Sequence, residues 1–309
     1  MHIPDGFLST GVSLILWAIS VVVIGIALRR VGRELGERQV PLMGVLAAAI
    51  FAGQMLNFAV AGGTSGHLLG ATLATILLGP WPAIVVMTSV VSIQAIVFQD
   101  GGLLALGSNL FNMALVGVAV SHFSWSSIRS LTGRTKAGFY GGAAVSAWLS
   151  IVIAAIACAL EIAVSGTSPA NLAVPAMAGI HALIGVGEAV ITAGAVAFLL
   201  AARPDLLQSG NMTANRSRAV WIGGALMTLV LVAAAPLASK YPDGLERVAQ
   251  KQGFWASAQN PIQGLIPNYV LPGIRDHAMA TVLAVAVGSV LVLITTLVVA
   301  RSGRRKRSG

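Results

Sequence analysis

The chain has 309 residues, of which 56% are hydrophobic and only 9% are charged. A soluble domain carries about 25% charged residues, so this composition excludes an ordinary soluble domain and indicates a protein embedded in lipid. The net charge of +9 does not indicate nucleic-acid binding, because the basic residues flank apolar segments and crowd the tail at 301–307, as membrane topology signals do.

The first apolar stretch, 7–28, has no cation before it and is followed by a basic cluster at 29–38. A signal peptide has the opposite order, with its positive region first. We therefore expect 7–28 to be a retained membrane span. A bulky second residue, His2, protects the initiator methionine from removal, so the mature protein is expected to begin with the free amine of Met1.

Eight further apolar segments follow, and together the nine predict an all-α integral membrane protein of about nine transmembrane helices. The later segments lie at 40–61, 67–79, 81–98, 105–123, 138–164, 174–202, 219–239 and 278–300. Gly, Ala and Ser are abundant throughout, and such small residues let helices pack closely in lipid.

The orientation follows from the distribution of positive charge, which favours the cytoplasmic side. With the N-terminus outside and the C-terminus cytoplasmic, the outer side keeps only four of the 19 Lys and Arg residues. These four are Lys240, Arg247, Lys251 and Arg275.

A polar linker at 203–218 and a polar outer loop at 240–277 divide the chain. We expect a seven-span body over 1–205, an appended two-span module over 219–300, and a basic cytoplasmic tail over 301–309.

The single cysteine, Cys158, excludes an internal disulfide and a cysteine-based metal site. The informative histidines are His2 and His67, which the predicted topology places together at the outer face. The amine of Met1, the amide nitrogen of His2 and its ring Nδ1 can chelate one ion in a plane, and the ring of His67 can fill the fourth position. Ni(II) and Cu(II) favour four planar nitrogens, whereas Mg²⁺ and Ca²⁺ require oxygen ligands.

Several polar residues near the outer face could orient these ligands from outside the coordination sphere. The candidates are Asp5, Ser65, Gln94, Asp100, Asn109 and Asn112. Hydrogen bonding between helices is the alternative role for the last four. His181 and Glu188 are seven residues apart and share one helix face, and for them we favour structural pairing over contact with a substrate.

Six sequence words stand in a fixed order in the first two thirds of the chain. They are Met1–Leu8, Ser65–Gly70, Leu77–Trp81, Phe98–Leu103, Gly107–Met113 and His181–Glu188. In this order they resemble the CbiM/NikM family, the substrate-binding subunits of energy-coupling factor (ECF) transporters for cobalt and nickel. The appended module resembles the PDGLE domain, a CbiN/NikN-like unit, through its word at 242–246. One departure is Ala59, where the family often has proline.

The resemblance implies a multi-pass protein of the inner or plasma membrane that captures Ni²⁺ or Co²⁺ through Met1, His2 and His67. It implies no cofactor and no enzymatic activity of this chain. The implied partners are a transmembrane coupling (T) subunit, ATPase (A) subunits and membrane lipid. The choice between nickel and cobalt stays open.

Two other functions compete with this interpretation. Ser65 and His181 could form the dyad of an intramembrane serine protease, which requires the two side chains to be in hydrogen-bond reach. The chain could also be an autonomous ion carrier or channel. It has no Gly-x4-Gly-Lys-Ser/Thr sequence and so no ATP-binding loop of that kind, but an autonomous carrier would usually show charges in matched broken helices.

Overall fold

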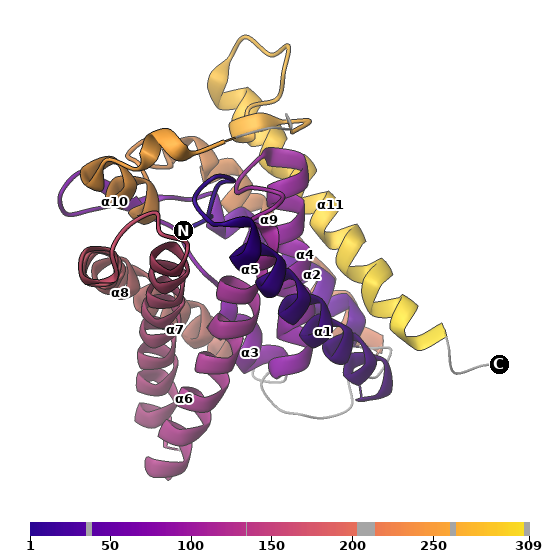
Figure 1. Ribbon diagram of the computed structural model, residues 1–309. Helices are drawn as coiled ribbons and strands as arrows, with labels where there is room; N and C mark the ends of the chain where they lie inside the picture. Colours follow the sequence, from indigo (N-terminus) through magenta and orange to yellow (C-terminus); the bar gives the residue numbers. More distant parts are fainter. Residues whose placement is uncertain (35–38, 134, 203–213, 260–263, 306–309) are drawn as a thin grey trace.

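The computed structural model describes residues 1–34, 39–133, 135–202, 214–259 and 264–305. Within them, seven helical segments are long and apolar enough to cross a membrane (Figure 1). They are α1 (Thr10–Glu34), α4 (Pro80–Phe98), the continuous α5 (Leu106–Leu110), η2 (Phe111–Val116) and α6 (Gly117–Leu131), α7 (Lys136–Val164), α8 (Ala170–Ala202), α9 (Ala214–Ala234) and α11 (His277–Arg305). The predicted all-α membrane fold is confirmed.

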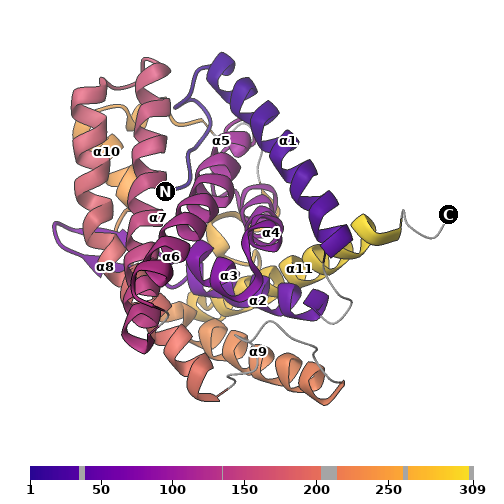
Figure 2. The ribbon, with the colours of Figure 1, turned by 90° about the horizontal axis from the view of Figure 1, so that it is seen from below.

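The remaining elements are short. They are the helices α2 (Val40–Gln54), α3 (Ala71–Leu78) and α10 (Gly244–Gln252), the one-turn helices η4 (Ala235–Leu237), η5 (Trp255–Ser257) and η6 (Pro267–Tyr269), and the strands β1 (Phe58–Val60) and β2 (Thr64–Gly66). The two strands pair as an antiparallel hairpin. Figure 2 shows α7 and α8 side by side at one edge of the bundle and α9 at another.

Two of the nine predicted spans differ from expectation. The segment 40–61 is a helix only as far as Gln54 and then enters the hairpin. The segment 67–79 contains only the eight-residue α3, which is about 12 Å long and far shorter than a hydrocarbon core of about 30 Å. Gly70 and Gly79, which bound α3, have positive φ of 80° and 81°, a region that glycine adopts readily and that lies outside the helical conformation.

The non-helical backbone before α3 is satisfied by two buried side chains. Glu188 on α8 accepts hydrogen bonds from the amides of Leu69 (2.6 Å) and Gly70 (3.0 Å). Gln54 donates from Nε2 to the carbonyl of Leu69 at 2.8 Å. Irregular backbone in a membrane protein is tolerated only where protein buries and pairs it, so these contacts give Glu188 a structural task.

The segments assigned to the outer face by the charge pattern meet at one end of the bundle. The amide of Gln259 donates to the carbonyl of Asp5 (2.7 Å), and that of Ser239 donates to the carbonyl of Asn57 (2.7 Å). In Figure 1 the N-terminus lies beside α10 at this end. Residues 203–213 of the predicted linker and 306–309 of the predicted tail lie outside the described residues.

Candidate metal centre

The first eight residues fold into the bundle because their backbone and apolar side chains find buried partners. Ile3 and Phe7 are fully buried. The side chain of Asn109 holds the backbone of Ile3 at two points, accepting from its amide (2.8 Å) and donating to its carbonyl (3.1 Å). The amide of Gly102 donates to the same carbonyl at 2.9 Å. The residue after His2 is therefore fixed in position.

Asp5 anchors the same loop from its other side. Its carboxylate accepts hydrogen bonds from the amides of Leu103 (3.1 Å) and Ala105 (2.9 Å). Asp5 and Asn109, both predicted from the sequence to support the site, thus tie the N-terminal loop to the 100–110 region.

The structure brings all three predicted ligand residues together. Met1, His2 and His67 expose only 3%, 9% and 8% of their surface. The amine of Met1 lies 3.3 Å from Nε2 of His67, and the rings of His2 and His67 stack with centroids 5.4 Å apart. Within the described residues the amide nitrogen of His2 has no hydrogen-bond acceptor, so no such bond has to be broken for it to bind an ion.

His67 presents a free lone pair to the Met1 amine. Its Nδ1 lies 2.9 Å from the carbonyl of Leu68, and a carbonyl can only accept, so Nδ1 carries the proton. Nε2 is then the unprotonated nitrogen. Burial, followed by the positive charges of the Met1 amine and of His2, lowers the pKa of His67 to about 3. The ring is therefore neutral at physiological pH, which is the form that binds metal.

A chain of buried amides fixes the proton on His2. Gln54, already engaged with the carbonyl of Leu69, accepts through Oε1 from Nε2 of Gln94 at 2.6 Å. Oε1 of Gln94 is thereby left to face Nε2 of His2 at 3.1 Å. An amide oxygen only accepts, so Nε2 of His2 carries a hydrogen and is occupied by Gln94. Nδ1 lies 3.0 Å from Oδ1 of Asp100. The ionised carboxylate also only accepts, so Nδ1 carries a hydrogen here and must release it to bind an ion.

Two carboxylates and one phenol lie around the predicted ligand residues. The amine of Met1 lies 2.5 Å from Oδ2 of Asp243, and the hydroxyl of Tyr269 donates to Asp100 at 2.5 Å. Burial opposes ionisation of Asp243, but the amine's charge and a hydrogen bond from the amide of Glu246 outweigh it and lower its pKa to about 2. Burial likewise opposes ionisation of Asp100, but the charge and hydrogen bond of His2 hold its pKa well below the usual range.

Gln54, Asp243 and Tyr269 were not predicted from the sequence. Asp243 was recognised only as part of the word at 242–246. The signal that could have pointed to it is its position as an acidic residue in a loop on the same side as the N-terminal amine. Gln54 and Tyr269 carry no such signal. Their contacts join them to Gln94 and Asp100, which lie 40 and 169 residues away.

The other predicted residues have partners away from the ligands. The hydroxyl of Ser65 donates to the carbonyl of Tyr241 at 2.8 Å, and Nδ1 of His181 pairs with the carbonyl of Met177 at 2.8 Å. These two side chains share no hydrogen bond among the described residues, which disfavours the protease dyad. Asn112, in the π-helical turn η2, donates to Glu161 on α7 at 2.8 Å.

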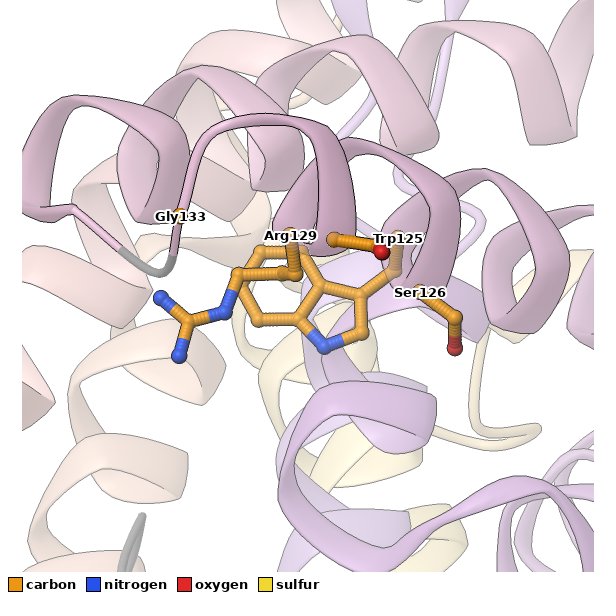
Figure 3. Close-up of a pocket in the computed structure, with 5 residues that line it drawn as sticks. Trp125, Ser126, Arg129 and Gly133 are labelled. Carbon is orange, nitrogen blue, oxygen red and sulfur yellow. The ribbon is translucent and has the colours of Figure 1, made fainter.

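A pocket of about 560 Å³ lies at the C-terminal end of α6 and contains none of the predicted ligands. It is lined by Trp125, Ser126, Arg129, Ser130 and Gly133. Figure 3 shows the guanidinium of Arg129 alongside the indole of Trp125, with 5.5 Å between the guanidinium carbon and the ring centroid.

No group of three or more His, Cys, Asp or Glu side chains in the described part of the chain could hold a metal ion. Two imidazoles alone would give an incomplete site. The terminal amine and the following amide are two further nitrogens that could complete it, so the N-terminus itself is the feature that makes metal capture chemically reasonable here.

Comparison with protein-family models gives two matches. Residues 2–206 match the CbiM model, described as the cobalt uptake substrate-specific transmembrane region. Residues 218–305 match the PDGLE domain.

Individual relatives agree with this result. A putative fused nickel transport protein NikMN of Archaeoglobus fulgidus is 38% identical, over 98% of this chain and 99% of that protein. A cobalt transport protein CbiM of Sorangium cellulosum is 33% identical, over 67% of this chain and 94% of that protein. A crystal structure described as a truncated transition metal transporter is similar with a TM-score of 0.59 and 35% identity, covering 65% of this chain and 99% of that one.

Proposed function

This chain belongs to the CbiM family of cobalt uptake substrate-specific transmembrane proteins and carries a PDGLE domain, and on that premise we propose that it is the substrate-binding subunit of an ATP-driven, ECF-type importer. Its cargo is Ni²⁺ or Co²⁺, captured at the outer face of the membrane. The relatives named above are described as nickel or cobalt transport proteins.

The observation that carries this proposal is the meeting of Met1 and His67. Their nitrogens lie 3.3 Å apart although 66 residues separate them in the chain, and the stacked ring of His2 lies beside them. Two nitrogens that bind one ion are close neighbours in space, so this arrangement fits a shared metal. The Met1 amine, the His2 amide, Nδ1 of His2 and Nε2 of His67 are the proposed ligands.

Binding of the ion then replaces hydrogen bonds that these groups make in the metal-free protein. The amine and the amide each give up a proton to water, and Nδ1 of His2 passes its proton to Asp100 as it turns to the ion. Asp5 and Asn109 keep the loop in place during this exchange, and Gln94 keeps the hydrogen on Nε2 of His2. Four nitrogens in a plane favour Ni²⁺ over Co²⁺, in keeping with the general order of affinities.

The remaining parts of the importer are proposed to be separate proteins. The sequence contains no Gly-x4-Gly-Lys-Ser/Thr loop for ATP, so hydrolysis is assigned to ATPase subunits acting through a transmembrane coupling subunit. We assign metal binding to residues 1–205 and an accessory role to the module 219–300. From the distribution of positive charge, we place the N-terminus outside the cell and the basic tail in the cytoplasm.

Transport by reconstituted protein tests this assignment. The chain is placed in vesicles alone, and in parallel with a coupling subunit and ATPase subunits of the same source, and uptake of ⁶³Ni²⁺ is measured with and without ATP. We expect uptake only with partners and ATP. Rapid uptake by the chain alone would favour an autonomous carrier and contradict the subunit assignment.

A further inference from the structure

The outer loop of the C-terminal module reaches the metal site, and we propose that Asp243 in this loop is a positioning residue that holds the Met1 amine where it can capture the ion. This inference rests on the proposed function, because it assigns a task within the same site. It also gives the appended module a role in metal binding, although none of the proposed ligands lies in that module.

The two oxygens of Asp243 have different partners. Oδ2 lies 2.5 Å from the Met1 amine. Oδ1 accepts from the amide of Glu246 at 2.8 Å, which makes Asp243 the N-cap of α10. The position of the terminal amine is thereby tied to the first turn of a helix.

The loop that carries Asp243 is itself fixed to the body of the protein. The amide of Ser65, two residues before the proposed ligand His67, donates to the carbonyl of Pro242 at 2.8 Å. Arg247 donates to the carbonyl of Gly62 at 3.1 Å. Asp243 is therefore held on both sides by contacts with the hairpin that precedes His67.

Gly244 lets the start of α10 pack closely against His181 on α8. A Cβ atom at Gly244 would lie 2.7 Å from Cε1 and 3.0 Å from Nε2 of His181, whose ring is buried. A side chain here would force α10 away from α8, and the carboxylate of Asp243 would move with it.

The same module also supports His2, through a contact with Asp100. The hydroxyl of Tyr269 donates to Asp100, which faces Nδ1 of His2. Tyr269 has φ of 56°, a conformation that is uncommon for bulky residues and is retained where surrounding contacts impose it. Its ring stacks on Phe98 with centroids 4.7 Å apart. The loop thus supports Met1 through Asp243 and His2 through Asp100.

Charge balance favours one carboxylate at this position. In the metal-free site the ammonium of Met1 carries one positive charge, which Asp243 neutralises. A divalent ion bound by a deprotonated amide also leaves one net positive charge, because two protons have left to water. A buried unpaired charge is costly, and the same carboxylate avoids that cost in both states.

The contact is with the amine itself, so Asp243 is assigned a positioning role and not a place in the coordination sphere. A metal-bound amine keeps two N–H groups, and one of them can still donate to Oδ2. Outer residues of this kind typically change metal affinity 10–100-fold when removed.

The test uses Asp243→Asn, which keeps an oxygen to cap α10 but removes the charge. Ni²⁺ affinity of the purified full chain is measured by chelator competition, with Glu246→Gln as the matched control on the same helix turn. We expect a loss of about 10–100-fold for Asp243→Asn, none for Glu246→Gln, and an unchanged visible spectrum of Ni²⁺ at saturation. An unchanged affinity would overturn the proposal, and so would a changed spectrum, which would make Asp243 a ligand.

A second readout needs no metal, so it stays informative if the proposed function fails. The metal-free protein is treated with an amine-reactive succinimidyl ester, and modification of Met1 is followed by peptide mass spectrometry. Asp243→Asn and Gly244→Ala should both speed the modification several-fold, because each frees the amine. Equal rates in these variants and the unmodified chain would show that Asp243 does not hold the amine.

Discussion

Replacing Gln54 by Leu should weaken Ni²⁺ binding about fivefold, although Gln54 touches no proposed ligand. Its Nε2 donates to the carbonyl of Leu69 and its Oε1 accepts from Gln94, which leaves the oxygen of Gln94 for His2. Without Gln54, one hydrogen bond no longer holds Gln94 in that orientation. A hydrogen bond of this kind contributes about 1 kcal/mol, and a factor of ten corresponds to about 1.4 kcal/mol.

The effect should depend on Gln94. Gln94→Leu removes the contact with Nε2 of His2 and should cost about 10–100-fold in affinity. The double variant should be no weaker than Gln94→Leu alone, because residues in one network do not act additively. Thr75→Val is the control, since among the described residues the buried Thr75 hydroxyl bonds only to the carbonyl of Ala71 in its own helix.

Affinities are measured by chelator competition on purified protein. Normal affinity in Gln54→Leu, or fully additive losses in the double variant, would refute the relay of amides from Leu69 to His2.

Three further outcomes follow from the geometry. His67, whose pKa is lowered to about 3 by burial, should stay neutral down to about pH 4, so its ¹⁵N resonances in the metal-free protein should show no midpoint near pH 6.5. Asn109→Leu should weaken Ni²⁺ binding about 30-fold, because it removes two hydrogen bonds of about 1 kcal/mol each from the loop; Ser108→Ala should not, since the Ser108 hydroxyl has no partner among the described residues. Glu188→Gln should destabilise the protein by about 2 kcal/mol, because one oxygen that accepts a backbone amide is replaced by a donor, and thermal unfolding should show no comparable loss for Thr192→Val.

Hydropathy predicted the membrane fold because each long span is a continuous apolar run. The same method overestimated the length of the helix in 67–79, because apolar composition gives no indication of the positive φ angles at Gly70 and Gly79. Such a segment is stabilised by Glu188 and Gln54 from other helices, and contacts of that kind leave no periodic trace in the local sequence.

The proposed chelate could be read from the sequence because its N-terminal amine and second-position histidine are adjacent residues. The prediction that His67 lies beside them needed only the expected topology, which puts both segments at the outer face. Asp243 was not predictable in the same way, because its contact with Met1 joins residues 242 positions apart. Asn112, expected to support the site, instead donates to Glu161, since residues near one end of a helix can face different neighbours.

Adding three residues before Met1 tests the central claim most directly. The extension leaves every side chain in the sequence but turns the Met1 amine into a peptide amide, so the free amine no longer lies next to the amide and Nδ1 of His2. Ni²⁺ and Co²⁺ bound per chain are measured by elemental analysis after equilibrium dialysis, with the same three residues added after Gly309 as the control. The account predicts one tightly bound ion in the unmodified chain and in the control and none in the N-terminal extension, whereas undiminished binding in that variant would contradict it.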